Sequence, residues 1–156
     1  MHFGIEAGQS FSNNASDTRL LRLVARDRLT LVPQENWGRW SLWWEGSAGA
    51  WRYRADGQTK HLLDIGVTPI VRYFFNGDTG PFLEGGVGAH YLSRRYERGD
   101  TYFSTHWQFG SHLGMGYRFA GGAGELTLRV QHLSNGGLEK PNPGVNFALL
   151  SVSTTF

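Results

Sequence analysis

The sequence predicts an all-β protein, an eight-stranded antiparallel transmembrane β-barrel of the bacterial outer membrane. The first observation is an alternation of apolar and polar residues with a period of two, which runs through most of the 156 residues and is typical of strands with two unlike faces. The second is that no stretch approaches the roughly 18 to 20 consecutive apolar residues of a membrane helix. The third is that the apolar faces are aliphatic with flanking Trp, Tyr and Phe, as in the lipid-facing band of a barrel.

The composition fits one domain, residues 1–156, and excludes several functions. The chain has no Cys, so disulfides, thiolate metal sites and a cysteine nucleophile are excluded. A formal net charge of +2 is too small to predict nucleic-acid binding. From Met1 onward there is no basic segment followed by an apolar one. We therefore expect a signal peptide to be absent or already removed, with Met1 added to a mature chain.

The alternation places the strands one after another. It predicts them over 3–9, 19–28, 37–45, 63–75, 83–91, 107–119, 125–131 and 146–156. The strand at 19–28 is less regular than the others, and segment 27–36 fits a strand extension, a turn or a short helix. An alternating segment ends the chain at Phe156, and this ending resembles the terminal signature of bacterial outer-membrane barrels.

The face that looks inward separates a membrane barrel from a soluble one. In the clearest strand, Leu63, Ile65 and Val67 share one face, and Asp64 and Thr68 share the other. A soluble ligand-binding barrel would hold the apolar set inside, whereas a membrane barrel presents it to lipid. The polar set fits the narrow interior of an eight-stranded barrel if its charges neutralise each other. The charged residues expected inside are Glu6, Asp64, Arg72, Glu84, Arg118, Glu125 and Arg129.

The lengths of the connections predict the orientation in the membrane. Segments 76–80 and 120–124 are tight turns, whereas 51–60, 93–102 and 135–145 are longer. Short turns lie on the periplasmic side of outer-membrane barrels and long loops lie outside, so both termini are expected in the periplasm. The long loops carry basic residues, which are either ordinary solvated charges or groups that attract anionic lipid head groups. These residues are Arg52, Arg54, Lys60, Arg94, Arg95 and Arg98.

Two polar residues continue the apolar face of the strand at 125–131. His132 and Ser134 keep the parity of the lipid-facing residues at its outer end, and counting back along the last strand places Asn146 opposite His132. A serine nucleophile needs a base, and the base needs a partner on its other ring nitrogen. We therefore expect Ser134 as nucleophile, His132 as base and Asn146 as the group that orients His132. An isolated His or Ser at a strand end is more often a polar interfacial residue without a catalytic role.

Acyl transfer also needs hydrogen-bond donors for the developing oxyanion. The turn Asn135-Gly136-Gly137 offers backbone N–H groups close to Ser134. A side-chain amide is available from Asn135 or from Asn142. The segment after the strand therefore holds candidate oxyanion donors of both kinds.

The run from His132 to Gly144 closely resembles the His-x-Ser-Asn motif and following loop of the outer-membrane lipid A 3-O-deacylase family (PagL type), and segment 81–88 resembles a second segment of that family. The resemblance implies an eight-stranded barrel whose serine-hydrolase site faces the outer leaflet and removes the ester-linked 3-hydroxy acyl chain at position 3 of lipid A. It implies that Ser134 is the nucleophile and that Asn142 and the Gly137 backbone stabilise the oxyanion. The implied substrate is lipopolysaccharide, with neither a metal nor an organic cofactor.

One position departs from this family. Where its members usually have an acidic third residue, the chain has Asn146. An amide can orient an imidazole but cannot stabilise imidazolium by charge, so a slower enzyme, an engineered substitution and an inactive relative all stay open. The outer-membrane phospholipase A family is similar in placing Asn behind a His-x-Ser pair. Glu139 in the loop is a weaker candidate for the acid.

Three alternative functions stay open at this point. One is a phospholipase A-like esterase, although the barrel of that family is considerably longer than this chain allows. Another is a barrel that binds lipopolysaccharide without turnover, and the third is a soluble ligand-binding barrel. The aromatic-rich outer face would suit lipid or a second copy of the chain, so a homodimer also stays open.

Overall fold

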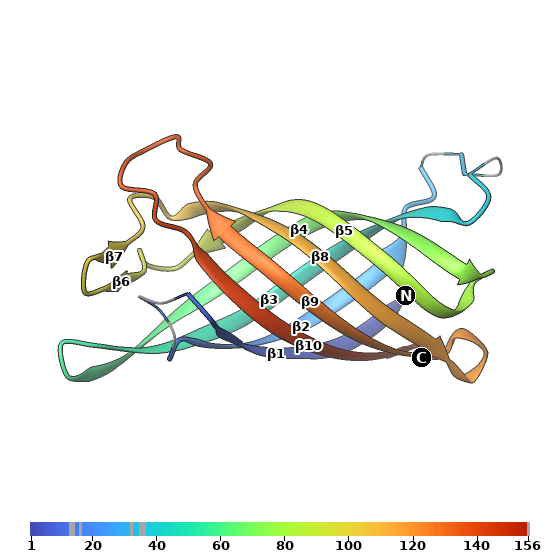
Figure 1. Ribbon diagram of the computed structural model, residues 1–156, viewed down its shortest axis with the longest axis horizontal. Helices are drawn as coiled ribbons and strands as arrows, with labels where there is room; N and C mark the ends of the chain where they lie inside the picture. Colours follow the sequence, from blue (N-terminus) through green and yellow to red (C-terminus); the bar gives the residue numbers. More distant parts are fainter. Residues whose placement is uncertain (13–14, 16, 32, 35–36, 156) are drawn as a thin grey trace.

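The computed structural model describes residues 1–12, 15, 17–31, 33–34 and 37–155, and these form a closed β-barrel (Figure 1). Neighbouring barrel strands pair antiparallel in chain order, and β1 pairs with β10 to close the barrel. The predicted eight-stranded barrel is therefore confirmed. Its strands are β1 (His2–Ser10), β2 (Arg19–Arg28), β3 (Trp40–Ala55), β4 (Gln58–Asn76), β5 (Thr79–Leu92), β8 (Trp107–Phe119), β9 (Gly124–Ser134) and β10 (Val145–Thr155).

Short elements lie in two of the connections. β6 (Glu97–Arg98) and β7 (Thr101–Tyr102) form a hairpin between β5 and β8. The 3₁₀ helix η1 (Ala120–Gly122) lies in the turn between β8 and β9. Within the described ranges, no helix combines the length and the apolar character that crossing a membrane requires.

The two ends of the barrel carry different connections (Figure 1). The β3–β4 turn, the β6–β7 hairpin and the β9–β10 connection lie at one end, which we call the long-loop end. Both termini lie at the other end with the β4–β5 and β8–β9 turns, and we call this the terminal end. The termini therefore share an end with the two predicted tight turns, 76–80 and 120–124. Phe156, on which the predicted terminal signature depends, lies outside the described residues.

The sequence predicts a long loop over 51–60, and this prediction is wrong. β3 and β4 continue through the segment and meet at a two-residue turn, Asp56-Gly57. Both turn residues have positive φ, 54° and 73°, as such hairpin turns require. Inward and outward residues still alternate in β3 beyond the apolar band. The outward positions there are Arg52 and Arg54, so the hydropathy of this segment resembles that of a loop.

The structure describes the start of β3 and, of the segment before it, residues 27–31, 33–34 and 37–39. β3 begins at Trp40, three residues after the start of the predicted strand 37–45. Of the three alternatives for 27–36, a strand extension holds only as far as Arg28, where β2 ends. The next residue, Leu29, donates its backbone N–H to the carbonyl of Leu42 at 2.9 Å, which ties the connection to β3.

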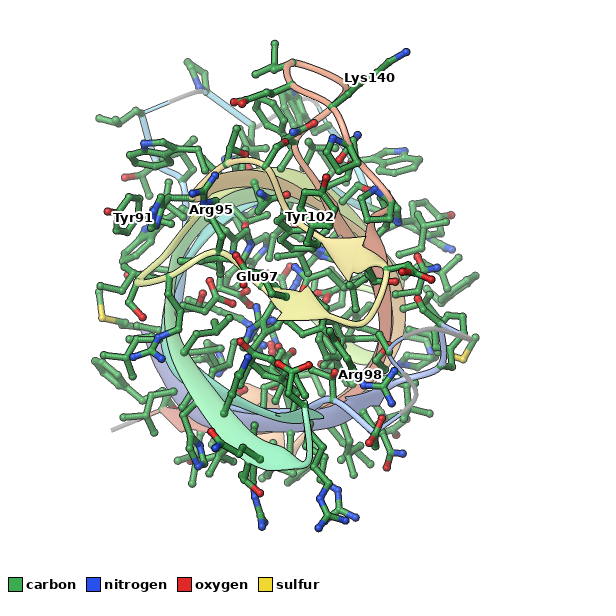
Figure 2. All side chains as sticks on the ribbon, turned by 90° about the vertical axis from the view of Figure 1, so that its left-hand side faces the viewer. Tyr91, Arg95, Glu97, Arg98, Tyr102 and Lys140 are labelled. Carbon is green, nitrogen blue, oxygen red and sulfur yellow. The ribbon has the colours of Figure 1, made fainter. Side chains whose placement is uncertain are left out.

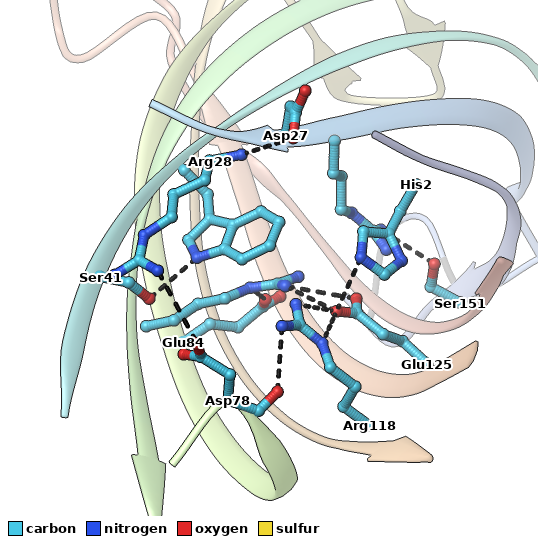
Figure 3. Close-up of polar contacts among 12 residues, drawn as sticks. His2, Asp27, Arg28, Ser41, Asp78, Glu84, Arg118, Glu125 and Ser151 are labelled. Atoms are coloured by element: carbon cyan, nitrogen blue, oxygen red, sulfur yellow. Dashed lines mark hydrogen bonds and ion pairs between the residues drawn. The ribbon is translucent and has the colours of Figure 1, made fainter. Parts of the chain in front are cut away.

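The interior of the barrel is filled by charged side chains that pair with one another. Arg72 donates to Glu84 at 2.9 Å and to Glu125 at 3.0 Å. Figure 3 shows part of this network near the terminal end, where Arg118 bonds both Glu125 and the backbone carbonyl of Asp78. All seven charged residues that the sequence places inside are buried. The prediction of a polar interior with paired charges is therefore confirmed.

The outward face of the barrel is apolar. Leu113 is 75% exposed and Ile65 is 62% exposed, and other large apolar residues on β1, β2, β5, β9 and β10 are similarly open. Such a wide apolar surface marks contact with lipid or a partner rather than with water. The soluble ligand-binding barrel, which needs the apolar set inside, does not fit this orientation.

An aromatic cluster lies inside the barrel at the long-loop end. Trp51 packs edge-on against Tyr96 and Phe147, with ring centroids 5.7 and 4.8 Å apart, and Phe103 packs on Tyr96 at 5.5 Å. Tyr96 also shares a 2.7 Å hydrogen bond with Thr18, and burial raises the pKa of its phenol. Because Tyr96 and Phe103 belong to the β5–β8 connection, the cluster holds the β6–β7 hairpin across the barrel opening (Figure 2).

Candidate active site

His132 and Asn146 meet on the outward face of the barrel at the long-loop end. They are direct partners in the register of β9 with β10. The His132 Nδ1–H donates to Asn146 Oδ1 at 2.7 Å. This bond fixes the ring orientation and places the proton on Nδ1, which leaves the Nε2 lone pair free to accept a proton.

The backbone of Asn146 is held on the side away from β9. Its N–H donates to Ser12 Oγ at 2.8 Å, and its carbonyl accepts from the N–H of Phe11 at 3.0 Å. Both contacts come from the residues that follow β1. The backbone that carries the Asn146 side chain is therefore held by β9 on one side and by the residues after β1 on the other.

Gly144 makes room for the His132 ring. Its φ is +66°, and a Cβ at this position would lie 2.4 Å from Cε1 and 3.0 Å from Nε2 of His132. A glycine is thus required twice, for the backbone conformation and for the space. The sequence analysis did not single out Gly144; its only local signal is its place after Pro143, just before the last strand.

Ser134 lies two residues beyond His132 on the same strand and is half-buried, opposite Phe109 of β8. Within the described part of the chain, its hydroxyl makes no hydrogen bond to another protein group. The proton-transfer contact with His132 is therefore not formed in this structure. In serine hydrolases without substrate such contacts are often long and shorten only in the complex.

The buried side chain of Asn135 organises the loop after β9. Its Nδ2 donates to the Glu139 carbonyl at 2.7 Å and to Ser104 Oγ at 2.9 Å. Its Oδ1 accepts from the N–H of Gly137 at 2.9 Å. The Asn135 amide and the Gly137 N–H, two of the predicted oxyanion donors, are therefore occupied within the loop. The Asn135 side chain supports the loop and is not free to face an ester.

Asn142 is the predicted oxyanion donor that keeps a free N–H. Its Oδ1 accepts from the backbone N–H of Asn135 at 2.9 Å. This contact sets the orientation of the Asn142 side-chain amide, so its Nδ2 points away from the backbone of Asn135. Among the described residues Nδ2 has no hydrogen-bond partner. Asn142 is therefore the strongest candidate for stabilising negative charge near Ser134.

Ser104 is a site residue that the sequence analysis missed. It lies in the β5–β8 connection, is buried, and its hydroxyl is within 3.1 Å of the carbonyls of both Glu139 and Pro141 while it accepts from Asn135. One side chain thus joins the two connections at the long-loop end. Glu139 contributes its carbonyl, and no described contact joins its carboxylate to His132.

A shallow apolar hollow begins at His132 on the outer wall. It measures about 770 Å³. Gly85 creates part of it, because the neighbouring outward residues Leu83 and Val87 carry side chains and Gly85 does not. Its lining residues are Leu42, Pro69, Val71, Gly85, Gly86, Val87, Ser111, His112, Leu113, Val130 and His132. An extended hydrocarbon chain could lie in this hollow with its polar end at His132.

The described residues hold no group of three or more His, Cys, Asp or Glu side chains that could bind a metal ion.

An outward-facing histidine oriented by an amide, beside a serine and a loop with a free amide N–H, forms the candidate site of this closed β-barrel. A model of the lipid A 3-O-deacylase (PagL) family matches residues 24–155. The chain belongs to this family.

Two relatives have related sequences. Lipid A deacylase PagL of Bordetella bronchiseptica is 30% identical over 123 residues, which cover 78% of this chain and 66% of the relative. Lipid A deacylase PagL of Pseudomonas aeruginosa is 33% identical over 113 residues, which cover 72% of this chain and 63% of the relative. The chain thus spans slightly less than two thirds of the length of each relative.

Two solved structures share the fold. The crystal structure of the outer membrane enzyme PagL superposes with a TM-score of 0.80 at 22% identity and covers 100% of both chains. The crystal structure of Neisserial surface protein A superposes with a TM-score of 0.65 at 15% identity, over 99% of this chain and 96% of the other. At these identities the likeness shows the barrel fold alone.

Proposed function

We propose that the protein is a lipid A 3-O-deacylase of the bacterial outer membrane. It would hydrolyse the ester that links a 3-hydroxy acyl chain to position 3 of lipid A. Family membership supports this activity, and the relatives named above are lipid A deacylases. The observation that carries the proposal is the hydrogen bond between His132 and Asn146, on the outward face of the barrel and two residues from Ser134.

The proposed mechanism is acyl transfer to serine. Ser134 Oγ attacks the ester carbonyl while His132 Nε2 takes the hydroxyl proton, and Asn142 Nδ2 donates to the oxyanion of the tetrahedral intermediate. The imidazolium then returns the proton to the departing sugar oxygen, which leaves the acyl chain on Ser134. A water molecule activated by His132 cleaves this second ester, releases the fatty acid and restores the hydroxyl.

The position of the site suits a lipid ester. His132 lies where the apolar wall of β9 ends, next to Val130, which is 52% exposed. With the wall in the hydrocarbon layer, the site lies at the boundary between acyl chains and head groups. The hollow that starts at His132 accommodates the acyl chain. We propose that the long-loop end, and with it the site, faces the outer leaflet, because the long β5–β8 and β9–β10 connections lie there.

The test is mass spectrometry of lipid A after incubation with the refolded protein in detergent. We expect loss of one 3-hydroxy acyl chain with the unmodified protein. Ser134→Ala should lower the rate by about 10³-fold or more, because the nucleophile is removed. Thr154→Ala, which removes an exposed hydroxyl from β10 near the terminal end, is the matched control and should keep full activity.

Other outcomes of the same experiment would identify the alternatives. Release of fatty acid from a glycerophospholipid but not from lipid A would favour a phospholipase A-like esterase. Retention of intact lipid A by the folded, unmodified protein would favour a binding barrel without turnover. Loss of the acyl chain at the same rate with Ser134→Ala would overturn the proposed mechanism.

A further inference from the structure

Cationic side chains lie on the outward face of β2 and β3 at the long-loop end. In the strand register Arg19 lies opposite Arg52, and Arg52 lies opposite His61. Arg54 lies one step farther out on β3, opposite Thr59. All of these side chains are exposed. We call Arg19, Arg52 and Arg54 the cationic patch, and His61 continues their row onto β4.

The arginines of the cationic patch have no counter-charge in the described structure. Among the described residues, Arg19, Arg52 and Arg54 form no ion pair and no side-chain hydrogen bond. Asp17 lies beside them, but its carboxylate is paired with Arg98. Like charges directly opposite each other destabilise a strand pair, so Arg19 and Arg52 repel. A bound anion would remove this repulsion.

A hollow of about 440 Å³ lies among these arginines. Its lining residues are Asp17, Arg19, Arg52, Tyr53, Arg54 and Thr59. Planar guanidinium groups bind phosphate through paired, charge-assisted hydrogen bonds. The volume far exceeds the roughly 30 Å³ share of one water molecule, so a phosphate group with part of its parent sugar could enter.

An apolar row lies next to the cationic patch on the same wall. Leu21 is opposite Ala50, which is opposite Leu63, each two residues from the cationic row toward the middle of the barrel. Leu21 is 59% exposed and Leu63 is 60% exposed. The wall thus offers a hydrocarbon surface followed directly by positive charge. An acylated, phosphorylated amphiphile complements both.

The cationic patch is separate from the candidate active site. Around the closed barrel, β8, β5 and β4 separate β9 from β3 on one side, and β10, β1 and β2 separate them on the other. The two surfaces therefore lie on opposite walls at the same end. One lipid bound at Ser134 cannot also occupy the cationic patch across the barrel.

We propose that the cationic patch binds the phosphorylated head group of a second lipid A molecule, one that is held and not hydrolysed. This inference rests on the proposed function, which places the long-loop end in the leaflet that contains lipid A. The bound lipid fixes the depth and tilt of the barrel on the wall opposite the site. It thereby keeps His132 and Ser134 at the level of the ester.

The experiment counts lipid A molecules bound to the full chain in detergent by native mass spectrometry. A Ser134→Ala background prevents consumption of the lipid. Arg19→Gln with Arg52→Gln should weaken one of two binding events by at least about tenfold. The matched control, Arg28→Gln with Arg39→Gln, removes one half-buried and one exposed arginine at the terminal end and should keep both events. Arg54→Gln alone should give an intermediate loss.

Two further probes test the chemistry of the bound group. Lipid A without its phosphates should bind the unsubstituted patch as weakly as intact lipid A binds the Arg19, Arg52 variant. Phosphatidylglycerol should compete poorly, and equal competition would overturn the assignment to lipid A. Equal binding of lipid A by the variant and its control would overturn the proposal that the cationic patch binds lipid A. Acyl release by the otherwise unmodified chain, measured separately, tests the proposed function independently.

Discussion

At the scale of single residues, the amide in the place of an acid has a measurable consequence. Asn146 orients His132 through a 2.7 Å bond but brings no charge to the imidazolium that the proposed mechanism requires. We expect Asn146→Glu to raise the deacylation rate at neutral pH by about tenfold, because a carboxylate stabilises imidazolium as well as orienting the ring. Steady-state release of the 3-hydroxy fatty acid measures this.

Removal of the orienting group is the control for that substitution. Asn146→Leu keeps a similar volume but lets the ring turn, and should lower the rate by about 100-fold. If Asn146→Leu were as active as the unmodified protein, the bond to His132 would have no catalytic role. The barrel itself should unfold at the same denaturant concentration in all three proteins, since Asn146 lies on the outer wall.

Gly144 gives a second prediction at the residue scale. We expect Gly144→Ala to reduce turnover by about 100-fold, because its Cβ would displace the Cε1 and Nε2 edge of His132. Gly57→Ala is the matched control. Gly57 also has positive φ, +73°, but no described atom lies within 4 Å of its added Cβ, so it imposes the same backbone strain without the clash. Similar activity losses in both variants would contradict a role for Gly144 in positioning the ring.

At the scale of elements, Ser104 connects the β5–β8 connection to the loop that holds Asn142. Ser104→Ala removes the hydroxyl from three hydrogen bonds, to Asn135, Glu139 and Pro141. We expect about a tenfold loss in kcat with little change in KM, because the loop loses order around the oxyanion donor while the acyl hollow stays intact.

A second serine in the β5–β8 connection provides the control. It distinguishes a specific effect of Ser104 on the loop that holds Asn142 from a general loosening of the connection. Ser93 accepts one hydrogen bond, from the N–H of Leu63 at 2.9 Å, on the outer wall of β4. Ser93→Ala should therefore leave kcat unchanged. The proposed role of Ser104 in ordering the Asn142 loop is contradicted if both serine variants lose activity equally, or if the Ser104 variant changes only KM.

The elements also show what a sequence can predict here. The period-two alternation located the barrel strands and the inward charges, because each pleated strand imposes its two faces locally. It failed at 51–60, where backbone pairing continues after the apolar band has ended. The alternation also predicted that His132 and Asn146 lie opposite each other, because both continue the outward face of their strands. The roles of Ser104 and Gly144 could not be predicted in this way. They depend on contacts with Asn135 and His132, and no local pattern encodes these contacts.

At the scale of the whole molecule, stability depends on the buried ion pairs. Arg129 contacts Glu45 at 2.7 Å and Glu6 at 3.2 Å, and also pairs with Glu84, at the centre of the barrel. Arg129→Met would leave these carboxylates without that cation. We expect a loss of about 3 to 5 kcal/mol in the free energy of unfolding, measured with urea in detergent by tryptophan fluorescence.

An exposed arginine provides the comparison. Arg28 pairs with Asp78 at 3.9 Å, and its side chain is 39% exposed. Arg28→Met should change the free energy of unfolding by less than about 1 kcal/mol, because surface pairs are screened by solvent. Equal effects of the Arg28 and Arg129 substitutions would mean that the interior network does not determine stability.

The filled interior also determines how molecules would reach the proposed active site. Arg72 of β4 bonds Glu84 of β5 and Glu125 of β9, so its contacts bridge the barrel from wall to wall. In a planar bilayer we therefore expect an electrical insulator, without single-channel current steps. Substrate and both products must then arrive and leave sideways within one leaflet. Turnover in a membrane should accordingly follow two-dimensional diffusion, and slow down when the surrounding lipid becomes a gel.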